Sequence, residues 1–267
     1  MALIDDEYAS IANRFLAARR STRGLDSYPG QLPKELSEAY AVQAQAIAGW
    51  SKPILGWKVG RITGAFAEQY GADRLAGPIF HVVEANPFTA PEMPVFAEGF
   101  AAAEAEFVLR IGKSPPLGQT RFSLAETADL IDAVHVGIEI ASSPLTTINQ
   151  LGPAAIISDF GNNNGLIVGD AIENWRDSGF EQWPVTTSID GAEVGTGIAA
   201  DFNEGAIGSA RFLFELLTPL GHSLTPGQWI SSGAVSGVHQ ATPGQRVEAR
   251  FGSHSLVRCE LRTAEAE

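Results

Sequence analysis

Hydrophobic positions near the start of the chain recur at intervals of three and four residues, which is the spacing of the apolar face of an amphipathic helix. This spacing predicts one helix over residues 5–20, where an acidic first turn precedes the apolar positions. It predicts a second helix over about residues 33–50. The polar segment 21–33, which contains Gly and Pro, separates the two. Residues 1–52 are therefore expected to form a helical N-terminal region.

From residue 53 onward the pattern changes to short β-rich runs between turns that contain Gly or Pro. The clearest runs are ILGWKVG, EFVLRI, HVGIEI and GQRVEARF. Two further helices are predicted here, over residues 123–134, which open with a capping-box sequence, and over residues 208–217. No repeat or linker divides the chain, so we expect a single α+β unit in which a β-rich part, residues 53–267, follows the helical region.

The composition supports a folded, soluble chain. Its 267 residues are 45% hydrophobic, which is enough apolar material for a sizeable core. With 31 acidic against 18 basic residues the formal net charge is −13, and no basic run is longer than Arg19–Arg20. Such a chain repels a phosphate backbone, so a nucleic-acid partner is not expected.

A single cysteine, Cys259, excludes an internal disulfide and the cysteine-based zinc sites. The start of the chain is acidic, unlike the basic and then apolar start of a signal peptide. The longest apolar stretches are shorter than the ~20 residues that span a bilayer. These features predict a cytoplasmic protein in a reducing compartment, with no membrane association.

A pair of carboxylates, Glu104 and Glu106, interrupts the apolar segment 103–112. In a strand, side chains two positions apart share a face and lie roughly 7 Å apart. Two neighbouring carboxylates repel each other unless a proton, a cation or solvent lies between them, so a bound metal is one reason to place them there. A solvated strand face is the alternative, and the spacing alone leaves both open.

A third carboxylate, Glu139, lies on the polar face of the run 135–140, together with His135 and Gly137. The absence of a side chain at Gly137 is expected to leave room for a ligand near the backbone. Three carboxylates are oxygen donors, which suit Mg²⁺ or Mn²⁺, whereas zinc favours His or Cys. The three together strengthen the hypothesis of a metal site.

Lys58 lies between Gly56 and Gly60 on one face of a predicted strand. A lysine between two residues without side chains can approach a small anion closely, and its pKa can fall if the site is dry. The alternative is an edge-strand lysine that discourages aggregation.

Two other features are less specific. The segment 158–165 places Asp159 and Asn162 among amides and glycines, which suits either a polar ligand or simple turn formation. His81 and Glu84 could form a water-activating pair, but in an extended segment their side chains would face opposite sides. No serine-hydrolase elbow, dinucleotide-binding or P-loop motif is present.

Several segments together resemble the 2-keto-4-pentenoate hydratase branch of the fumarylacetoacetate hydrolase family. The most specific element is the Glu-x-Glu sequence with a third Glu, placed after GWKVG. The resemblance extends from about residue 27 to residue 261. Its segments, in chain order, are AYAVQAQAI, GWKVG, EAEFVLRIG, DAVHVGIEI, SDFGNNNGLIVG, GHSLTPGQWISSG and PGQRVEARFG.

The resemblance implies a mixed β-roll catalytic fold behind the helical N-terminal region. It implies a Mg²⁺ or Mn²⁺ site formed by Glu104, Glu106 and Glu139. It also implies catalytic roles for Lys58 and Asp159, the latter as a base or as a residue that orients water. The residues that it places in contact with the substrate are Lys58, Asn162 and Gly233.

Members of the family act on short 2-oxo or 2-hydroxy-dienoic acids from aromatic-compound catabolism. The resemblance therefore implies a lyase that adds water to a 2-hydroxy-2,4-dienoate and yields a 4-hydroxy-2-oxo acid. The alternatives are decarboxylation of a 2-oxo-dienedioate, C–C bond hydrolysis of an acylpyruvate, and a non-catalytic member of the family. The resemblance also implies a homo-oligomer, which could associate with a partner decarboxylase or hydratase.

Some positions depart from the hydratase pattern. Residues 141–143 follow Glu139 where an acidic residue and an arginine are usual, and residues 76–80 hold no carboxylate where many hydratases carry one. Ala234 follows Gly233 where a hydroxyl residue is frequent. The residues of the metal site are thus retained, whereas those expected to select the substrate and to position water are not.

Overall fold

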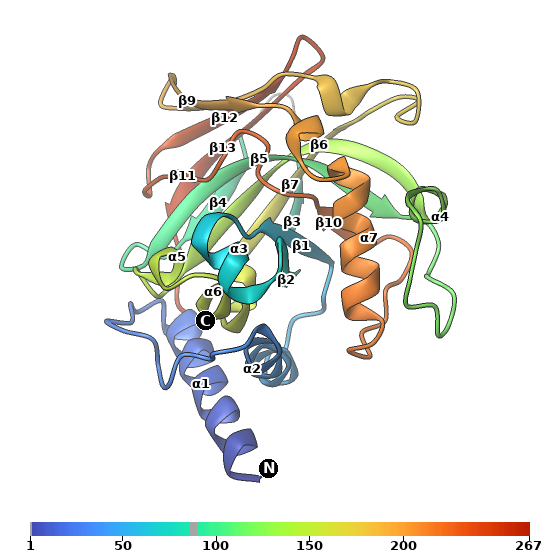
Figure 1. Cartoon of the computed structure of the whole chain (residues 1–267). Coiled ribbons are helices and arrows are strands. Elements are labelled where there is room, and N and C mark those ends of the chain that lie inside the picture. The colour runs from blue at the N-terminus through green and yellow to red at the C-terminus, as the bar shows by residue number, and fades with distance from the viewer. Residues whose placement is uncertain (1, 86–89) are drawn as a thin grey trace.

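The computed structural model describes residues 2–85 and 90–267, and no helix in these ranges is long and apolar enough to cross a membrane. Helices α1 and α2 lie at one end of a body built mainly of strands (Figure 1). The α-helices are α1 (Ala2–Ser21), α2 (Leu36–Ala48), α3 (Gly64–Tyr70), α4 (Leu124–Leu130), α5 (Ile148–Leu151), α6 (Pro153–Ser158) and α7 (Gly205–Leu217), and the short 3₁₀ helices are η1 (Phe160–Asn162), η2 (Phe180–Gln182) and η3 (Ala199–Asp201). The strands are β1 (Gly56–Arg61), β2 (Arg74–Ile79), β3 (Val82–Glu84), β4 (Glu92–Val95), β5 (Phe100–Ile111), β6 (Ile131–Ser143), β7 (Asn163–Ala171), β8 (Val185–Ile189), β9 (Ala192–Gly197), β10 (Trp229–Ser231), β11 (His239–Gln240), β12 (Arg246–Phe251) and β13 (Ser255–Thr263).

The described strands form two mixed sheets. The larger sheet has the order β2-β1-β10-β5-β6-β7-β3, with β11 also paired to β5, and the smaller has the order β4-β13-β12-β8-β9. Parallel pairs, such as β1 with β10 and β13 with β4, occur beside antiparallel pairs in both sheets. This combination of mixed sheets and helices confirms the predicted α+β class.

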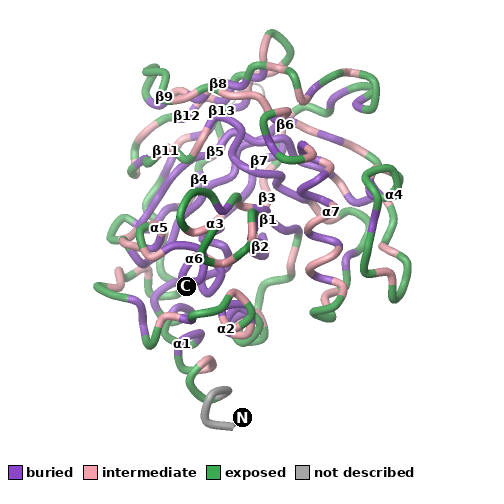
Figure 2. The backbone as a smooth tube through the Cα atoms, viewed as in Figure 1, coloured by how far each residue is buried: buried purple, intermediate pink, exposed green. Residues whose placement is uncertain are grey.

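The main core lies between the two sheets. Phe107 of β5 packs edge-to-face against Phe180 and against Phe251 of β12, with ring centroids 4.8 and 5.3 Å apart. Strands β5 and β6 are buried along nearly their whole length (Figure 2). Because these two strands are shielded from solvent, a charged side chain on either of them needs a partner inside the protein.

Helices α1 and α2 pack against each other and against the loop that precedes β7. Phe15 of α1 and Val42 of α2 share an apolar cluster with Phe160 of η1, in that segment. The helices predicted over residues 5–20 and 33–50 are confirmed, with small shifts at their ends. The N-terminal helices therefore support the segment that carries Asp159 and Asn162.

The helix predicted over residues 123–134 is shorter than expected. Helix α4 ends at Leu130, and Ile131 begins strand β6 opposite Ile111 of β5. Apolar positions spaced by three residues suit either a helix or a buried strand, so periodicity alone does not locate this boundary. Pairing with β5 decides it, because the strand gives the buried backbone groups of residues 131–134 hydrogen-bond partners.

Candidate metal and substrate site

Three carboxylates meet where β5 and β6 pair. Glu104 lies directly opposite Glu139 in the antiparallel register, and Glu106 lies opposite Gly137. One carboxylate oxygen from each of the three glutamates lies within 4.8 Å of the others. Directly opposed residues are the closest cross-strand neighbours, which is why the third carboxylate joins the first two.

The three carboxylates lie inside the protein. The exposed fractions of Glu104, Glu106 and Glu139 are 4%, 0% and 0%. The alternative of a solvated strand face is therefore wrong. Because ionised carboxylates are costly to bury, three of them in contact require counter-charges or a bound cation.

Gly137 does not provide the room for a ligand that was expected from its missing side chain. A Cβ at this position would lie 2.5 Å from the carbonyl oxygen of Ile167 and 2.6 Å from Val108 Cγ2. Glycine is required here because the backbone of β7 and a valine side chain already occupy the space.

Neighbouring groups hold one oxygen of two of the carboxylates and leave the other oxygen free. Glu106 Oε2 accepts hydrogen bonds from Ser231 Oγ at 2.5 Å and from the backbone N–H of Gly233 at 2.8 Å. Glu139 Oε1 accepts a hydrogen bond from Asn163 Nδ2 at 3.1 Å. Glu106 Oε1 and Glu139 Oε2 are buried and have no hydrogen-bond partner. Buried polar atoms are rarely left without a partner, and carboxylate oxygens suit hard divalent cations, so this set of residues fits Mg²⁺ or Mn²⁺.

Lys58 reaches the same carboxylates from strand β1. Its Nζ lies 3.1 Å from Glu139 Oε1, and the side chain is buried. Gly161 leaves room for the lysine stem, because a Cβ there would lie 2.9 Å from Lys58 Cδ. The alternative of an edge-strand lysine is wrong, since β1 lies between β2 and β10.

The buried charges shift one another's pKa values. Burial raises the pKa of Glu104 to about 7, while Lys58 opposes this shift and Glu139 adds to it. Burial, followed by the charges of Glu139 and Glu104, raises the pKa of Glu106 well above its usual range. Burial by itself lowers the pKa of Lys58, but the attraction of the three glutamates outweighs it and raises that pKa. The pKa of Lys58 is therefore raised rather than lowered in this buried site, because the glutamates act as its counter-charges.

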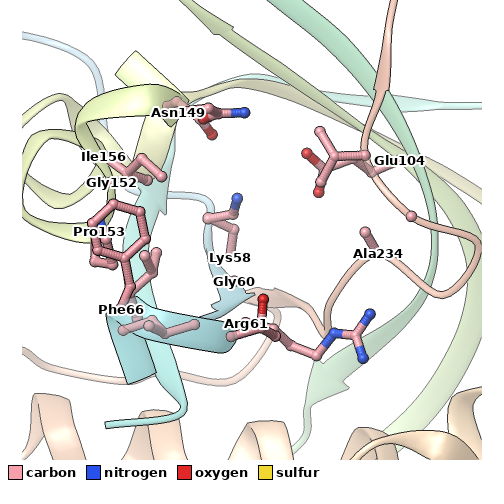
Figure 3. A pocket seen from close by; sticks show the side chains of 16 residues that line it. Lys58, Gly60, Arg61, Phe66, Glu104, Asn149, Gly152, Pro153, Ile156 and Ala234 are labelled. Atoms are coloured by element: carbon pink, nitrogen blue, oxygen red, sulfur yellow. The ribbon is translucent and has the colours of Figure 1, made fainter. Parts of the chain in front are cut away.

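A cavity of about 290 Å³ opens beside Lys58 and Glu104. Figure 3 shows the two side chains directed toward this space from different strands, with Asn149 and Phe66 on one side of it and Glu104 and Ala234 on the other. Asn162 also lines the cavity. Lys58 of β1, Glu104 of β5 and Asn162 of η1, all predicted from the sequence, thus line one cavity.

Asp159 does not line the cavity. Its buried carboxylate forms a two-point ion pair with Arg19 of α1, in which Nε lies 2.5 Å from Oδ1 and Nη2 lies 3.0 Å from Oδ2. Arg19 also donates hydrogen bonds to the carbonyl oxygens of Asn163 and Ser142. Bidentate pairing of this kind fixes geometry, so the contact fastens α1 to the segment before β7. This placement gives the predicted catalytic role of Asp159 no support.

Asn162 and Gly233 contribute to the site in different ways. Asn162 has a left-handed backbone with φ of 54°, its Nδ2 donates to Asn149 Oδ1 at 3.1 Å, and its Oδ1 is buried without a partner. The turn thus leaves an amide oxygen available to a ligand at the cavity wall. Gly233 gives its backbone N–H to Glu106, whereas Ala234, the next residue, lines the cavity.

Sequence reasoning missed residues that act across the sheet. Ser231 orients Glu106, Asn163 orients Glu139, and Arg61 lines the cavity. The sequence shows that the segments around Ser231 and Asn163 are polar. It does not show that these side chains contact Glu106 and Glu139, because the glutamates lie on strands that are distant in the sequence.

Neither family models nor curated protein sequences match this chain. Among solved structures, the 4-oxalocrotonate decarboxylase from Pseudomonas putida G7, complexed with magnesium and adipate, is similar with a TM-score of 0.81, 18% identity, and coverage of 96% of this chain and 97% of that chain. The fumarylpyruvate hydrolase from Pseudomonas aeruginosa, in complex with Mn²⁺ and pyruvate, is similar with a TM-score of 0.57, 14% identity, and coverage of 81% and 94%. The 2-hydroxyhepta-2,4-diene-1,7-dioate isomerase from Mycobacterium marinum is similar with a TM-score of 0.56, 18% identity, and coverage of 79% and 77%. These neighbours belong to the fumarylacetoacetate hydrolase family, and the likeness confirms that this chain has the fumarylacetoacetate hydrolase-like fold predicted from its sequence.

Proposed function

We propose that the chain is a divalent-metal-dependent lyase acting on a short 2-oxo acid, with Mg²⁺ or Mn²⁺ held by Glu104, Glu106 and Glu139. The observation that carries this proposal is the buried group of three carboxylates, with two free oxygens, beside a cavity that Lys58 also lines. When bound, such a cation supplies Lewis-acid stabilisation of negative charge on a 2-oxygen and its neighbouring carboxylate. The magnesium and Mn²⁺ in the similar decarboxylase and hydrolase structures support the choice of metal.

Lys58 has two roles in this proposal. Its raised pKa keeps the ammonium protonated, so it pairs with the carboxylate of a bound 2-oxo acid. It can also donate a proton to the enolate that the reaction produces. Asn149 and Asn162 orient the substrate with their amide groups at the cavity wall.

The residues around the cavity favour loss of carbon dioxide over addition of water. Hydration needs a base, but Glu104 is the only carboxylate, and no histidine is present, among the described residues that line the cavity. Asp159 is paired with Arg19. Decarboxylation of a 2-oxo-3-enedioate, whose departing carboxylate lies on the saturated carbon next to the double bond, needs no base. The bond to the departing carboxylate breaks, its electron pair passes through the conjugated double bond to the 2-oxygen, carbon dioxide leaves, and a proton then neutralises the enolate.

Hydration, the activity expected first from the sequence, remains a second candidate. The observation in its favour is Asn162 Oδ1, which is buried without a partner at the cavity and could hold a water molecule. The acylpyruvate hydrolase alternative has less support, because His81 and Glu84 are exposed and do not line the cavity. A non-catalytic role has less support as well, because three clustered buried carboxylates cost stability.

The proposal is tested by product analysis. The purified protein is incubated with 2-oxohex-3-enedioate and, separately, with 2-hydroxypenta-2,4-dienoate. Each incubation is carried out with Mg²⁺, with Mn²⁺ and with excess chelator, and the products are identified by mass spectrometry. Metal-dependent loss of carbon dioxide supports decarboxylation, and metal-dependent gain of water supports hydration. Equal rates with metal and with chelator would contradict a metal-dependent lyase. Glu248→Gln, on the smaller sheet, is a matched control for Glu106→Gln.

A further inference from the structure

The turn over residues 160–162, which carries Asn162 to the cavity, has a strained backbone. Phe160, Gly161 and Asn162 follow one another with φ of 56°, 65° and 54°, all in the left-handed region. Glycine and asparagine tolerate this region, but a bulky residue such as phenylalanine rarely enters it. Strain of this kind persists only where the surrounding structure holds the backbone in place. The contacts that hold this turn therefore decide where Asn162 lies.

Arg19 of α1 joins the two ends of the turn. Its Nη2 donates to the carbonyl oxygen of Asp159, before the turn, and its Nη1 donates to that of Asn163, after it, both at 3.2 Å. The same guanidinium pairs with both oxygens of the Asp159 carboxylate and lies 5.1 Å from the centroid of the Phe160 ring. The Arg19 side chain is 4% exposed, so these hydrogen bonds are shielded from water. One planar guanidinium thus fixes both ends of the turn.

The turn delivers two amide groups to the metal and substrate site. Asn162 lines the cavity, and its buried Oδ1 has no hydrogen-bond partner. Asn163, the next residue, donates from Nδ2 to Glu139 Oε1 at 3.1 Å. Arg19 itself does not line the cavity, so its effect on a bound molecule is indirect.

We propose that Arg19 is a positioning residue, which keeps Asn162 at the cavity and Asn163 on Glu139 and so sets the affinity of the site for its metal and its substrate. Without the two anchors the turn relaxes toward the right-handed backbone, because this relieves the strain at Phe160. The amide of Asn162 then leaves the cavity wall, and Asn163 loosens from Glu139. The inference rests on the proposed function, which places the metal at Glu139 and the substrate beside Asn162.

The test measures binding rather than turnover. Each protein is titrated calorimetrically, well below its melting temperature, with Mn²⁺ and then with 2-oxopentanoate, a short 2-oxo acid that lacks the double bond the proposed reaction requires. We expect Arg19→Gln to weaken binding of the acid about fivefold or more, which is the value of one hydrogen bond. Binding of Mn²⁺ should weaken about tenfold, the lower end of the effect of losing a group that orients a metal ligand.

Ile189→Ala, at a buried position on β8 of the smaller sheet, is the control for lost stability. The substitution leaves a cavity in the core and destabilises the chain without touching the turn. Both affinities should therefore equal those of the wild type.

A second substitution shows whether Arg19 acts through Asn162. Asn162→Gly removes the amide, and glycine keeps the left-handed backbone. We expect it to weaken binding of the acid in the wild type but to have little further effect in Arg19→Gln, where the amide is already displaced. A merely structural role of Arg19 gives the same effect of Asn162→Gly in both backgrounds.

The outcomes separate this inference from the proposed function. Wild-type affinity for the acid in a folded Arg19→Gln variant, or equal effects of Asn162→Gly in the two backgrounds, overturns the positioning role and leaves the proposed function standing. Equal losses of affinity in Ile189→Ala overturn it as well. Absence of metal-dependent binding by the wild type overturns both. Thermal unfolding establishes that each variant is folded, and Arg19→Lys, whose single ammonium lacks the guanidinium fork, replaces Arg19→Gln if that variant is not.

Discussion

Glu104 and Glu139 face each other directly across the β5–β6 ladder, and both are buried. This pairing makes a carboxylate of one strand the directly opposed neighbour of a carboxylate of the next. Like charges in that position destabilise a sheet unless something positive lies between them. Lys58 supplies one positive charge, and the free oxygens of Glu106 and Glu139 suit a second.

Removing one charge from the cluster should affect stability and metal binding in opposite directions. In Glu106→Gln, the amide oxygen can still accept the hydrogen bonds from Ser231 and Gly233, but the buried negative charge is lost. We expect the metal-free variant to be more stable than the metal-free wild type at pH values high enough to ionise Glu106, because charge repulsion is relieved there. Its affinity for Mn²⁺ should fall by a factor of about 100 or more, since outer hydrogen bonds alone are worth roughly 10–100-fold. Chemical denaturation and calorimetry measure the two effects, and a variant that is destabilised without metal would contradict the electrostatic explanation.

The stability of the metal-free protein should fall as pH rises from about 5 to above 7. The folded-state pKa of Glu104 is about 7, above its ordinary value of 4.5, so the folded state holds more protons than the unfolded state between these values. Stability from this group is fully present below pH 4.5 and is lost as pH passes through 7. The slope should flatten in Glu104→Gln. Added Mg²⁺ should stabilise the wild type most at high pH, where the carboxylates are ionised. Melting temperatures measured at several pH values, with chelator and with metal, check this prediction.

Loss of the buried ammonium should destabilise the protein strongly. Lys58→Met leaves the Glu139 carboxylate without its ionic partner, and breaking a buried pair by removing one member costs about 3–5 kcal/mol. The cost should be smaller in saturating Mn²⁺, because the cation replaces part of the lost positive charge. Lys113→Met, at an exposed position, is the control and should change the free energy of unfolding little. An equal cost with and without metal would show that the lysine and the cation do not share the same carboxylates.

Asp159 and Arg19 should behave as one structural unit. Asp159→Asn or Arg19→Gln alone should destabilise the protein by about 3–5 kcal/mol, and the double variant should cost much less than the sum of the two. If Asp159 instead acts as a base, Asp159→Asn should lower kcat far more than Arg19→Gln does. Denaturant unfolding of the four proteins, together with kcat measured well below their melting temperatures, separates the two explanations.

The spacing of hydrophobic and polar residues was sufficient to predict features that depend only on the period of a strand or a helix. Strand alternation predicted that Glu104 and Glu106 share a face, and helical spacing predicted α1 and α2. The polar face of the run 135–140 added the third glutamate, the resemblance to a known family added Lys58 to the same site, and the structure brings these residues together. Periodicity failed at residues 131–134, where an apolar segment suited to a helix is recruited as a strand by pairing with β5.

The contacts that complete the site depend on which strands become neighbours. Every residue except proline offers the same backbone hydrogen-bonding groups, so the sequence of a strand does not identify its neighbouring strand. The alternation of side chains therefore shows which face of the sheet a residue occupies, but not which residue lies beside it on the next strand. Placement of β10 between β1 and β5 brings Ser231 to Glu106, and the docking of α1 brings Arg19 to Asp159, 140 positions away. The amino-acid sequence by itself determined that Glu104 and Glu106 share one face of a strand and that three glutamates offer oxygen ligands suited to Mg²⁺ or Mn²⁺. The tertiary structure alone decided that Glu104, Glu106 and Glu139 are buried, that Lys58 pairs with Glu139, and that Asp159 lies outside the cavity. Burial and charge pairing arise only when distant segments pack together.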